Sequence, residues 1–155
     1  AITTFAGQNY GAHLISRIKK GTAEGLLMMG AISVFYTVLF YSTGKYIFRL
    51  FTADAAVIEE GMNILRFLSP FFIVYMPIEV LSGTIHGAGD TFRPMIITML
   101  GVCVLRIVWL FAAVPLHRTI NTVLACYPVT WITTSIVFFI YYASNAWIKE
   151  MDGTR

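Results

Sequence analysis

Two charged residues lie inside long apolar stretches of this 155-residue chain. Glu79 is the only charged residue within residues 67–89, and Arg106 is the only one within residues 94–117. An ionisable side chain in the middle of a membrane-spanning helix costs about 2.5 to 3.5 kcal/mol on insertion scales, so it usually faces a bundle interior or a water-filled cavity. A carboxylate in such a place can bind and release a proton or hold a cation. Glu79 and Arg106 are therefore the leading candidates for function.

Glu79 and Arg106 fall at similar depths if their segments are helices. At about 1.5 Å per residue, Glu79 lies roughly 13 Å and Arg106 roughly 18 Å inside the same end of the two segments. On adjacent antiparallel helices a long arginine side chain can bridge that difference. Several interpretations stay open. The two residues form an ion pair that only holds helices together; Glu79 binds and releases a proton or a cation as its exposure changes; Glu79 contacts a cationic substrate; or the two residues do not meet.

Two prolines precede Glu79 in the same segment. Pro70 and Pro77 lack the amide hydrogens that would bond to the carbonyl oxygens of Arg66 and Ile73. The helix should therefore be bent or locally unwound, and neighbouring helices, hydroxyl groups or water can satisfy the freed carbonyls. Such irregular sites often line a cavity. We expect Pro70 and Pro77 to supply flexure next to a cavity.

The chain carries none of the common catalytic or metal-binding motifs. It has no GxSxG elbow, no HExxH pair and no GxxxxGK[ST] phosphate loop, so hydrolytic, zinc-dependent and nucleotide-driven activities lack their minimum parts. His13, His86 and His117 are scattered near separate connections, and Cys103 and Cys126 both fall within apolar segments. We therefore expect no enzyme, no metal centre and no bound cofactor.

The segments that must position these residues follow from composition. Hydrophobic residues make up 57% of the chain and charged residues 12%, against about 25% in soluble domains, and the mean hydropathy is +0.73. Four charge-poor segments predict membrane-spanning helices at about 23–46, 55–88, 94–116 and 119–148. Continuous apolar runs such as IVWLFAA at 107–113 argue against a membrane barrel, whose strands alternate. The sequence therefore predicts an all-α integral membrane protein, with a four-helix unit over residues 23–148.

The flanking segments carry the charge that sets orientation. Residues 1–22 are predicted to be a cytoplasmic connection, with residues 12–20 either a short surface helix or a basic loop, and residues 149–155 a cytoplasmic tail. Six basic residues then lie on one side of the membrane and three on the other, or four with Arg66: Arg17, Lys19, Lys20, Arg93, Lys149 and Arg155 against Lys45, Arg49 and Arg118. The richer side should face the cytoplasm. The net charge of +3 fits contact with anionic membrane lipids, and scattered single charges give no support for nucleic-acid binding.

The connections on the basic side resemble those of a known family. GQNYGA at residues 7–12, followed by basic residues, is similar to the GQ-x-x-GA segment between the second and third helices of a half in the multidrug and toxic compound extrusion (MATE) transporters. GAGDTFRP at residues 87–94 is similar to the G-x-GDT-x-x-P connection between the fourth and fifth helices. The matching positions are Gln8, Gly11, Arg17, Gly87, Gly89, Asp90, Thr91 and Pro94. The resemblance implies that these residues shape cytoplasmic loops and are not the transport site.

Members of that family carry twelve helices in two six-helix halves around a central cavity, and they export cationic or amphipathic compounds by proton or sodium antiport. The resemblance implies that this chain supplies helices nine to twelve, or alternatively three to six, of a multi-pass exporter in a bacterial inner membrane. The expected partners are then membrane lipids, a small organic substrate and the missing N-terminal helices of the same polypeptide. A chain that opens with Ala-Ile-Thr-Thr, inside a connection, fits a piece of a longer polypeptide.

One position departs from the family pattern. Some sodium-coupled members place an acid about one turn before the position of Glu79, where this chain has Tyr75. Glu79 is the candidate coupling acid, and the choice between proton and sodium stays open. Two other functions stay open as well. They are a lipid or lipid-linked oligosaccharide flippase of related fold, and a non-transporting membrane scaffold in which Glu79 and Arg106 only lock helices together.

Overall fold

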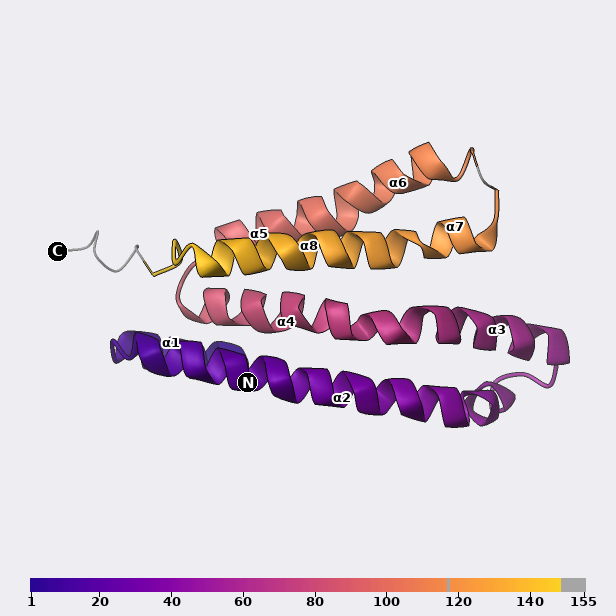
Figure 1. The fold of residues 1–155 in the computed structure, drawn as a ribbon, viewed down its shortest axis with the longest axis horizontal. Helices are drawn as coiled ribbons and strands as arrows, with labels where there is room; N and C mark the ends of the chain where they lie inside the picture. The colour runs from indigo at the N-terminus through magenta and orange to yellow at the C-terminus, as the bar shows by residue number, and fades with distance from the viewer. Residues whose placement is uncertain (117, 149–155) are drawn as a thin grey trace.

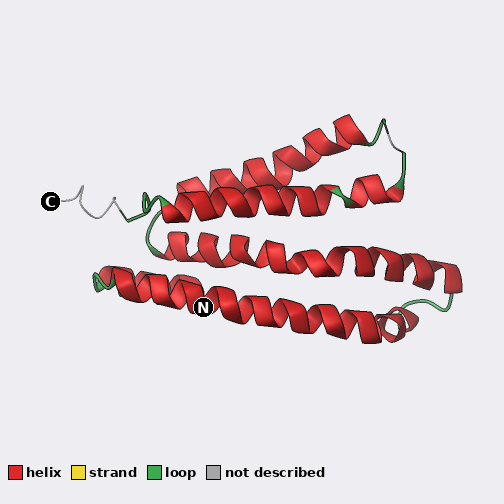
Figure 2. Cartoon of the chain, in the orientation of Figure 1, coloured by secondary structure: helices red, strands yellow, loops and turns green. Residues whose placement is uncertain are grey.

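The computed structural model describes residues 1–116 and 118–148, and every regular element within them is helical (Figure 2). The all-α prediction is confirmed. His117 and the predicted tail at 149–155, with Lys149 and Arg155, lie outside the described residues. In chain order the elements are α1 Ile2–Gly11, α2 Ile15–Arg49, α3 Ala55–Leu68, the 3₁₀ helix η1 Ser69–Phe71, α4 Phe72–Gly87, α5 Phe92–Thr98, the π-helix η2 Met99–Val104, α6 Leu105–Ala113, α7 Ile120–Leu124 and α8 Cys126–Ala143.

Four helical stretches are long and apolar enough to cross a membrane, as the charge-poor segments predict. They run Ile15–Arg49, Ala55–Gly87, Phe92–Ala113 and Ile120–Ala143 and are called the first to fourth spans below. The second span joins α3, η1 and α4, the third joins α5, η2 and α6, and the fourth joins α7 and α8. In a bilayer each stretch satisfies its own backbone hydrogen bonds, which is why long apolar runs become helices there.

The fourth span lies between the second and the third (Figure 1). α2 packs against α3 and α4, α4 packs against α8, and α8 packs in turn against α5 and α6. The α1–α2 turn, the α4–α5 connection and the last turn of α8 share one end of the bundle, which we call the Asp90 end. The α2–α3 and α6–α7 connections share the opposite, Asp54 end. The second and third spans, consecutive in sequence, are thus separated by α8 beyond a short contact of α4 with α5.

Residues 1–22 differ from the prediction of a connection with a short surface helix. Residues 2–11 form α1, which packs against α2 and α4, and residues 15–22 begin the 35-residue helix α2. A tight turn at His13, whose φ is 59°, reverses the chain between the two helices. The physical reason is burial. Ala6 of α1 and Ile18 of α2 are both 0% exposed, so each of these helices buries an apolar side chain inside the bundle, whereas Leu14 in the turn stays 41% exposed.

Glycines allow α1 to pack closely against its neighbours. A Cβ atom on Gly21 of α2 would overlap the ring of Phe5, and one on Gly87 of α4 would overlap the carbonyl oxygen of Thr3. Both neighbours belong to α1. In membranes small residues at helix contacts let backbones approach and gain van der Waals contact. α1 is therefore packed into the bundle as a third helix beside α2 and α4.

Pro70 interrupts the second span as predicted. A 3₁₀ turn replaces the α-helix there, between α3 and α4. The Tyr41 hydroxyl of α2 donates a 2.8 Å hydrogen bond to the carbonyl oxygen of Arg66, which Pro70 leaves without an amide partner. Pro77 behaves differently, because α4 continues through it as a helix. The break in this span is thus local to Pro70, and a neighbouring hydroxyl compensates for it.

The third and fourth spans are also irregular. The π-helix Met99–Val104 divides the third span, a feature that the sequence analysis did not predict. Gly101 within it faces Thr134 of α8 so closely that a Cβ atom would overlap the threonine hydroxyl. The fourth span breaks at Ala125, because Pro128 offers no amide hydrogen to the carbonyl of Leu124. Beyond these breaks, α5 lies along α8 while α6 diverges from it (Figure 1).

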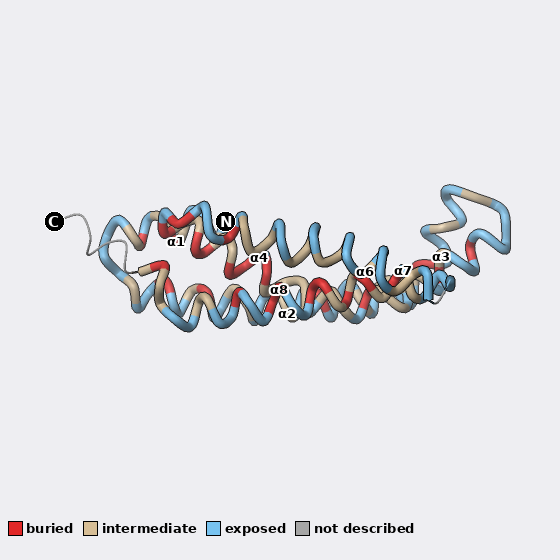
Figure 3. The backbone as a smooth tube through the Cα atoms, turned by 90° about the horizontal axis from the view of Figure 1, so that it is seen from above, coloured by how far each residue is buried: buried red, intermediate tan, exposed pale blue. Residues whose placement is uncertain are grey.

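Burial is concentrated in α1, α4 and α8 (Figure 3). In the fourth span 44% of the apolar window is buried inside the bundle, against 6% in the first span and none in the third. Large side chains such as Phe35 on α2 and Phe111 on α6 are 62% and 80% exposed. Apolar surface on this scale is not stable in water and marks contact with lipid or with further helices. The outer spans therefore present their apolar faces outward.

Candidate functional site

Glu79 lies on α4 and is held by a neighbour on its own helix. The Tyr75 hydroxyl donates a 2.5 Å hydrogen bond to the Glu79 carboxylate. Residues four apart share one face of an α-helix, so the two side chains run along the same side of α4. The Glu79 carboxylate is thus oriented by a tyrosine one helical turn earlier on the same helix.

Tyr75 also belongs to an aromatic cluster that spans the gap between α4 and α8. Trp131 of α8 is the centre of this cluster and is 8% exposed. Its ring centroid lies 5.3 Å from that of Tyr75, 6.0 Å from that of Phe72 and 5.7 Å from that of Tyr127. Offset and edge contacts at these separations are favourable, at about 0.5 to 1.5 kcal/mol for each pair. The cluster therefore fixes the α4 face that carries Tyr75 against α8.

Arg106 of α6 lies at the opposite side of this cluster. Its guanidinium carbon sits 4.2 Å from the centroid of the Tyr127 ring, a cation–π contact, and its Nη2 makes a long 3.5 Å contact with the Thr130 hydroxyl. Its Nε is buried and has no hydrogen-bond partner in the described part of the chain. Arg106 is thus bound to α8 by an aromatic face and one weak hydrogen bond.

Glu79 and Arg106 therefore do not form the ion pair that their depths allowed. Each charge is next to a tyrosine instead, Glu79 to Tyr75 and Arg106 to Tyr127. An ion pair between Glu79 and Arg106 would require the second and third spans to be adjacent. In the structure α8 lies between them, and Trp131 with its two tyrosines occupies the space that an ion pair would need.

Glu79 lines an open cavity of about 740 Å³ between α1, α2 and α4. The α2 side contributes Glu24, Met28 and Ile32, and the α4 side contributes Glu79 and His86. Of the candidate cavity residues, only Glu79 lines this space, and Tyr75, Pro70, Pro77 and Arg106 are not part of its lining. Glu24 was not identified from the sequence, because it lies just outside the charge-free run at 25–44 and near basic residues. Its helical spacing with Met28 and Ile32, at intervals of four, is the signal that places all three on one face.

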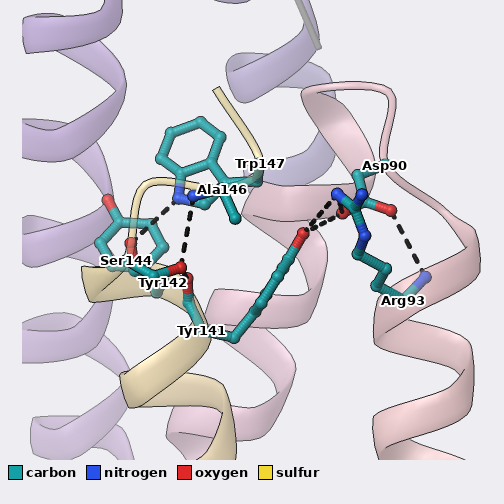
Figure 4. A network of polar contacts seen from close by, with 7 residues as sticks. All are labelled: Asp90, Arg93, Tyr141, Tyr142, Ser144, Ala146 and Trp147. Carbon is teal, nitrogen blue, oxygen red and sulfur yellow. Dashed lines mark hydrogen bonds and ion pairs between the residues drawn. The ribbon is translucent and has the colours of Figure 1, made fainter. Parts of the chain in front are cut away.

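At the Asp90 end a polar network joins the α4–α5 connection to α8 (Figure 4). The Tyr141 hydroxyl of α8 donates a short hydrogen bond to the carboxylate of Asp90, which is 5% exposed. Arg93 forms a 3.4 Å ion pair with that carboxylate and also donates to the Tyr141 oxygen at 3.0 Å. Asp90 further accepts a 3.4 Å hydrogen bond from the Arg93 amide in the first turn of α5. Sequence reasoning did not connect Tyr141 with Asp90, because the two residues are 51 positions apart in the chain.

The other motif residues gather at the same end of the bundle. Gln8, Gly11 and Arg17 are exposed around the α1–α2 turn. Gly89 adopts a φ of +97° in the α4–α5 connection, which explains a glycine there. Thr91 is the last residue before α5 and Pro94 is buried in its first turn. The two motifs meet where α1 touches the end of α4, since a Cβ atom on Gly7 would lie 3.2 Å from the Gly87 carbonyl oxygen. These residues therefore build one end of the bundle, away from the cavity acids.

Comparison of the sequence with known proteins finds one family model and two curated relatives. The family model described as MatE matches residues 1–111. The probable multidrug resistance protein YpnP of Bacillus subtilis is 24% identical over 150 residues, which cover 95% of this chain and 33% of that protein. The probable multidrug resistance protein NorM of Thermotoga maritima is 25% identical over 111 residues, which cover 69% of this chain and 23% of that protein. The chain thus spans a third or less of the length of these relatives, and no solved structure matches it.

Proposed function

The chain belongs to the MatE family, and from that premise we propose that it supplies four membrane-spanning helices of a longer secondary-active multidrug exporter. The two relatives, both named as probable multidrug resistance proteins, support this proposal. The single observation that carries it is the position of Glu79. An acid in a membrane span opens on a cavity of about 740 Å³, where water, an ion and an organic compound can reach it.

In this proposal Glu79 is the coupling acid, and a proton or a sodium ion is the coupling ion. The Glu79 carboxylate accepts a hydrogen bond from Tyr75, which holds it in one orientation. Binding of the coupling ion neutralises the acid and lowers its attraction for a cationic compound in the same cavity. Binding of the compound and binding of the ion then oppose each other in one cavity, so that entry of the ion can drive export of the compound, as antiport requires.

The four spans form one wall that moves against the remaining helices of the transporter. The outward apolar faces of α2 and α6 are the surfaces on which lipid and those further helices pack in this proposal. The 3₁₀ turn at Pro70 is a natural place for the second span to flex, since its carbonyl is satisfied by a side chain that can release it.

The orientation within this proposal follows from charge. Arg17, Lys19, Lys20 and Arg93 lie at the Asp90 end, whereas Lys45, Arg49 and Arg118 lie at the Asp54 end. The Asp90 end is then the cytoplasmic side of a bacterial plasma membrane, with the C-terminal end of α8 on that side. The scaffold alternative has less support, because Glu79 and Arg106 do not lock the second span to the third.

The experiment that tests the proposal is efflux of ethidium, a fluorescent organic cation, by the full-length transporter in membrane vesicles. An imposed pH or sodium gradient should drive efflux by the wild-type protein, and Glu79→Gln should abolish the response to the gradient. Glu60→Gln removes an equal charge from the exposed start of α3 and serves as the matched control. Unchanged efflux and unchanged dependence on the gradient in Glu79→Gln would remove Glu79 from the mechanism.

A further inference from the structure

A basic pocket lies between α2 and α3 at the Asp54 end. Its volume is about 770 Å³, and three cationic side chains line it, Lys45 and Arg49 of α2 and Arg66 of α3. Among the described residues of the lining, Glu59 is the only acid. The three cations are exposed, and their side chains form no ion pair or hydrogen bond in the described part of the chain. The pocket therefore carries more positive than negative charge, and its cations are available to an anion.

The position of these cations along the chain marks the level of the lipid headgroups. Lys45 directly follows the charge-free run 25–44, whose helical length of about 30 Å equals the thickness of a hydrocarbon core. Arg66 directly precedes the charge-poor run 67–89. Two helices thus change from apolar to charged sequence at the same pocket. The pocket therefore lies at the boundary between the hydrocarbon core and the headgroups.

An apolar groove continues from this pocket toward the middle of the membrane. It has a volume of about 450 Å³ and is lined by four residues of α2: Thr37, Val38, Tyr41 and Ser42. Lys45 lies four residues beyond Tyr41, so the groove and the basic pocket share one face of α2. The hydroxyl groups of Thr37, Tyr41 and Ser42 already donate to backbone carbonyl oxygens. The groove therefore offers a ligand mainly apolar surface.

We propose that the pocket and the groove together bind an anionic phospholipid such as phosphatidylglycerol. The phosphate diester lies among Lys45, Arg49 and Arg66, and one acyl chain follows the groove along Val38. Lysine and arginine form charge-assisted hydrogen bonds with phosphate oxygens, and basic pockets between membrane helices bind anionic headgroups. A soluble phosphate would match the charge of the pocket but would leave the groove empty. The combination of the two therefore favours a lipid over a soluble anion.

The test measures lipid binding to the delipidated full-length transporter in detergent by native mass spectrometry. Phosphatidylglycerol is compared with zwitterionic phosphatidylcholine of the same acyl chains, and the wild-type protein should bind phosphatidylglycerol with the lower Kd. Lys45→Gln combined with Arg49→Gln should raise the Kd for phosphatidylglycerol about tenfold and leave that for phosphatidylcholine within about twofold. Lys45→Arg combined with Arg49→Lys keeps both charges and should keep the affinity.

The matched control removes two cations from the opposite end of the same helix. Lys19 and Lys20 are exposed and lie outside the pocket, so Lys19→Gln combined with Lys20→Gln should bind phosphatidylglycerol as the wild-type protein does. Because Lys45 and Arg49 are exposed and make no side-chain hydrogen bond, their replacement by glutamine should leave the protein folded. Thermal unfolding in detergent checks this expectation.

Three outcomes would overturn the lipid site. They are wild-type affinity for phosphatidylglycerol in the Lys45 and Arg49 variant, an equal loss of affinity in the Lys19 and Lys20 control, and an equal loss for the two lipids. Glycerol 3-phosphate, which carries a phosphate without acyl chains, should not displace phosphatidylglycerol at millimolar concentration. Displacement would show a site for soluble phosphate and would also overturn the proposal. A lipid site requires only that the chain spans a membrane, so these results do not depend on the export of any compound.

Discussion

The hydroxyl of Tyr75 donates a 2.5 Å hydrogen bond to the carboxylate of Glu79, one helical turn further along α4. The same tyrosine ring lies 5.3 Å from Trp131 of α8. Tyr75 thus has two separable roles, since its hydroxyl group orients an acid and its ring holds two spans together. Trp131 also contacts Tyr127, and the ring of Tyr127 makes a cation–π contact with the guanidinium of Arg106. Both membrane-embedded charges are therefore anchored to one aromatic cluster.

Replacing Tyr75 with phenylalanine or alanine should separate the two roles. Tyr75→Phe keeps the ring on Trp131 and removes only the donor to Glu79, so the melting temperature should change little while gradient-driven efflux falls several-fold. Tyr75→Ala also removes the ring and should cost about 2 to 4 kcal/mol of stability, as truncation of a packed aromatic side chain does. Thermal unfolding in detergent and ethidium efflux measure the two effects. An equal loss of stability in both variants would contradict the separation.

Glu79 and Arg106 should behave as independent sites. Their partners are different tyrosines, and α8 lies between their helices, so no direct contact couples them. A double-mutant cycle of Glu79→Gln and Arg106→Gln on unfolding stability should give a coupling energy below about 0.5 kcal/mol. The charge-swapped pair, Glu79→Arg with Arg106→Glu, should not restore function. A coupling energy well above 1 kcal/mol, or rescue by the swap, would show instead that the two residues meet in another state.

The network at the Asp90 end should contribute measurably to stability. Tyr141→Phe removes the hydroxyl donor from the buried Asp90 carboxylate and should cost about 1 to 3 kcal/mol, the penalty for an under-satisfied buried polar group. Tyr46 is 67% exposed and makes no hydrogen bond in the described part of the chain, so Tyr46→Phe is a matched control with no expected cost. Denaturant unfolding of the purified protein compares the two. Equal stability of the two variants would mean that Arg93 alone satisfies Asp90.

Replacing a helical glycine with alanine should lower or raise the stability of the protein, depending on what surrounds the glycine. A Cβ atom on Gly87 would overlap the backbone carbonyl oxygen of Thr3 in α1. Unlike a side chain, the backbone of a packed helix cannot rotate to relieve the overlap. Gly87→Ala should therefore displace α1 and lower stability. Gly30 has open space around it, so Gly30→Ala should raise stability by up to about 1 kcal/mol through helix propensity alone. The melting temperatures of the two variants give the comparison, and a stabilising Gly87→Ala would refute the close packing of α1.

The sequence determined the features that depend on local rules. Charge-free runs fixed the four spans, because a bilayer excludes unpaired backbone groups and charges from any stretch that crosses it. Pro70 fixed the break in the second span, because a missing amide hydrogen acts within one turn. The membrane positions of Glu79 and Arg106 followed from the same reasoning, as did the expectation of a cavity beside Glu79.

The tertiary structure alone decided which of these elements are neighbours. Helices in a bilayer gain no hydrophobic energy from one another, so their lateral order rests on close packing between residues far apart in sequence. Packing of that kind inserted α8 between the second and third spans and left Glu79 and Arg106 with separate tyrosines. Close packing also places α1 (residues 2–11) inside the bundle, because Gly21 and Gly87 leave room for its residues. Glu24 and Glu79 line the same space only because α2 and α4 meet at the Gly25–Val80 contact, and no local pattern encodes that contact.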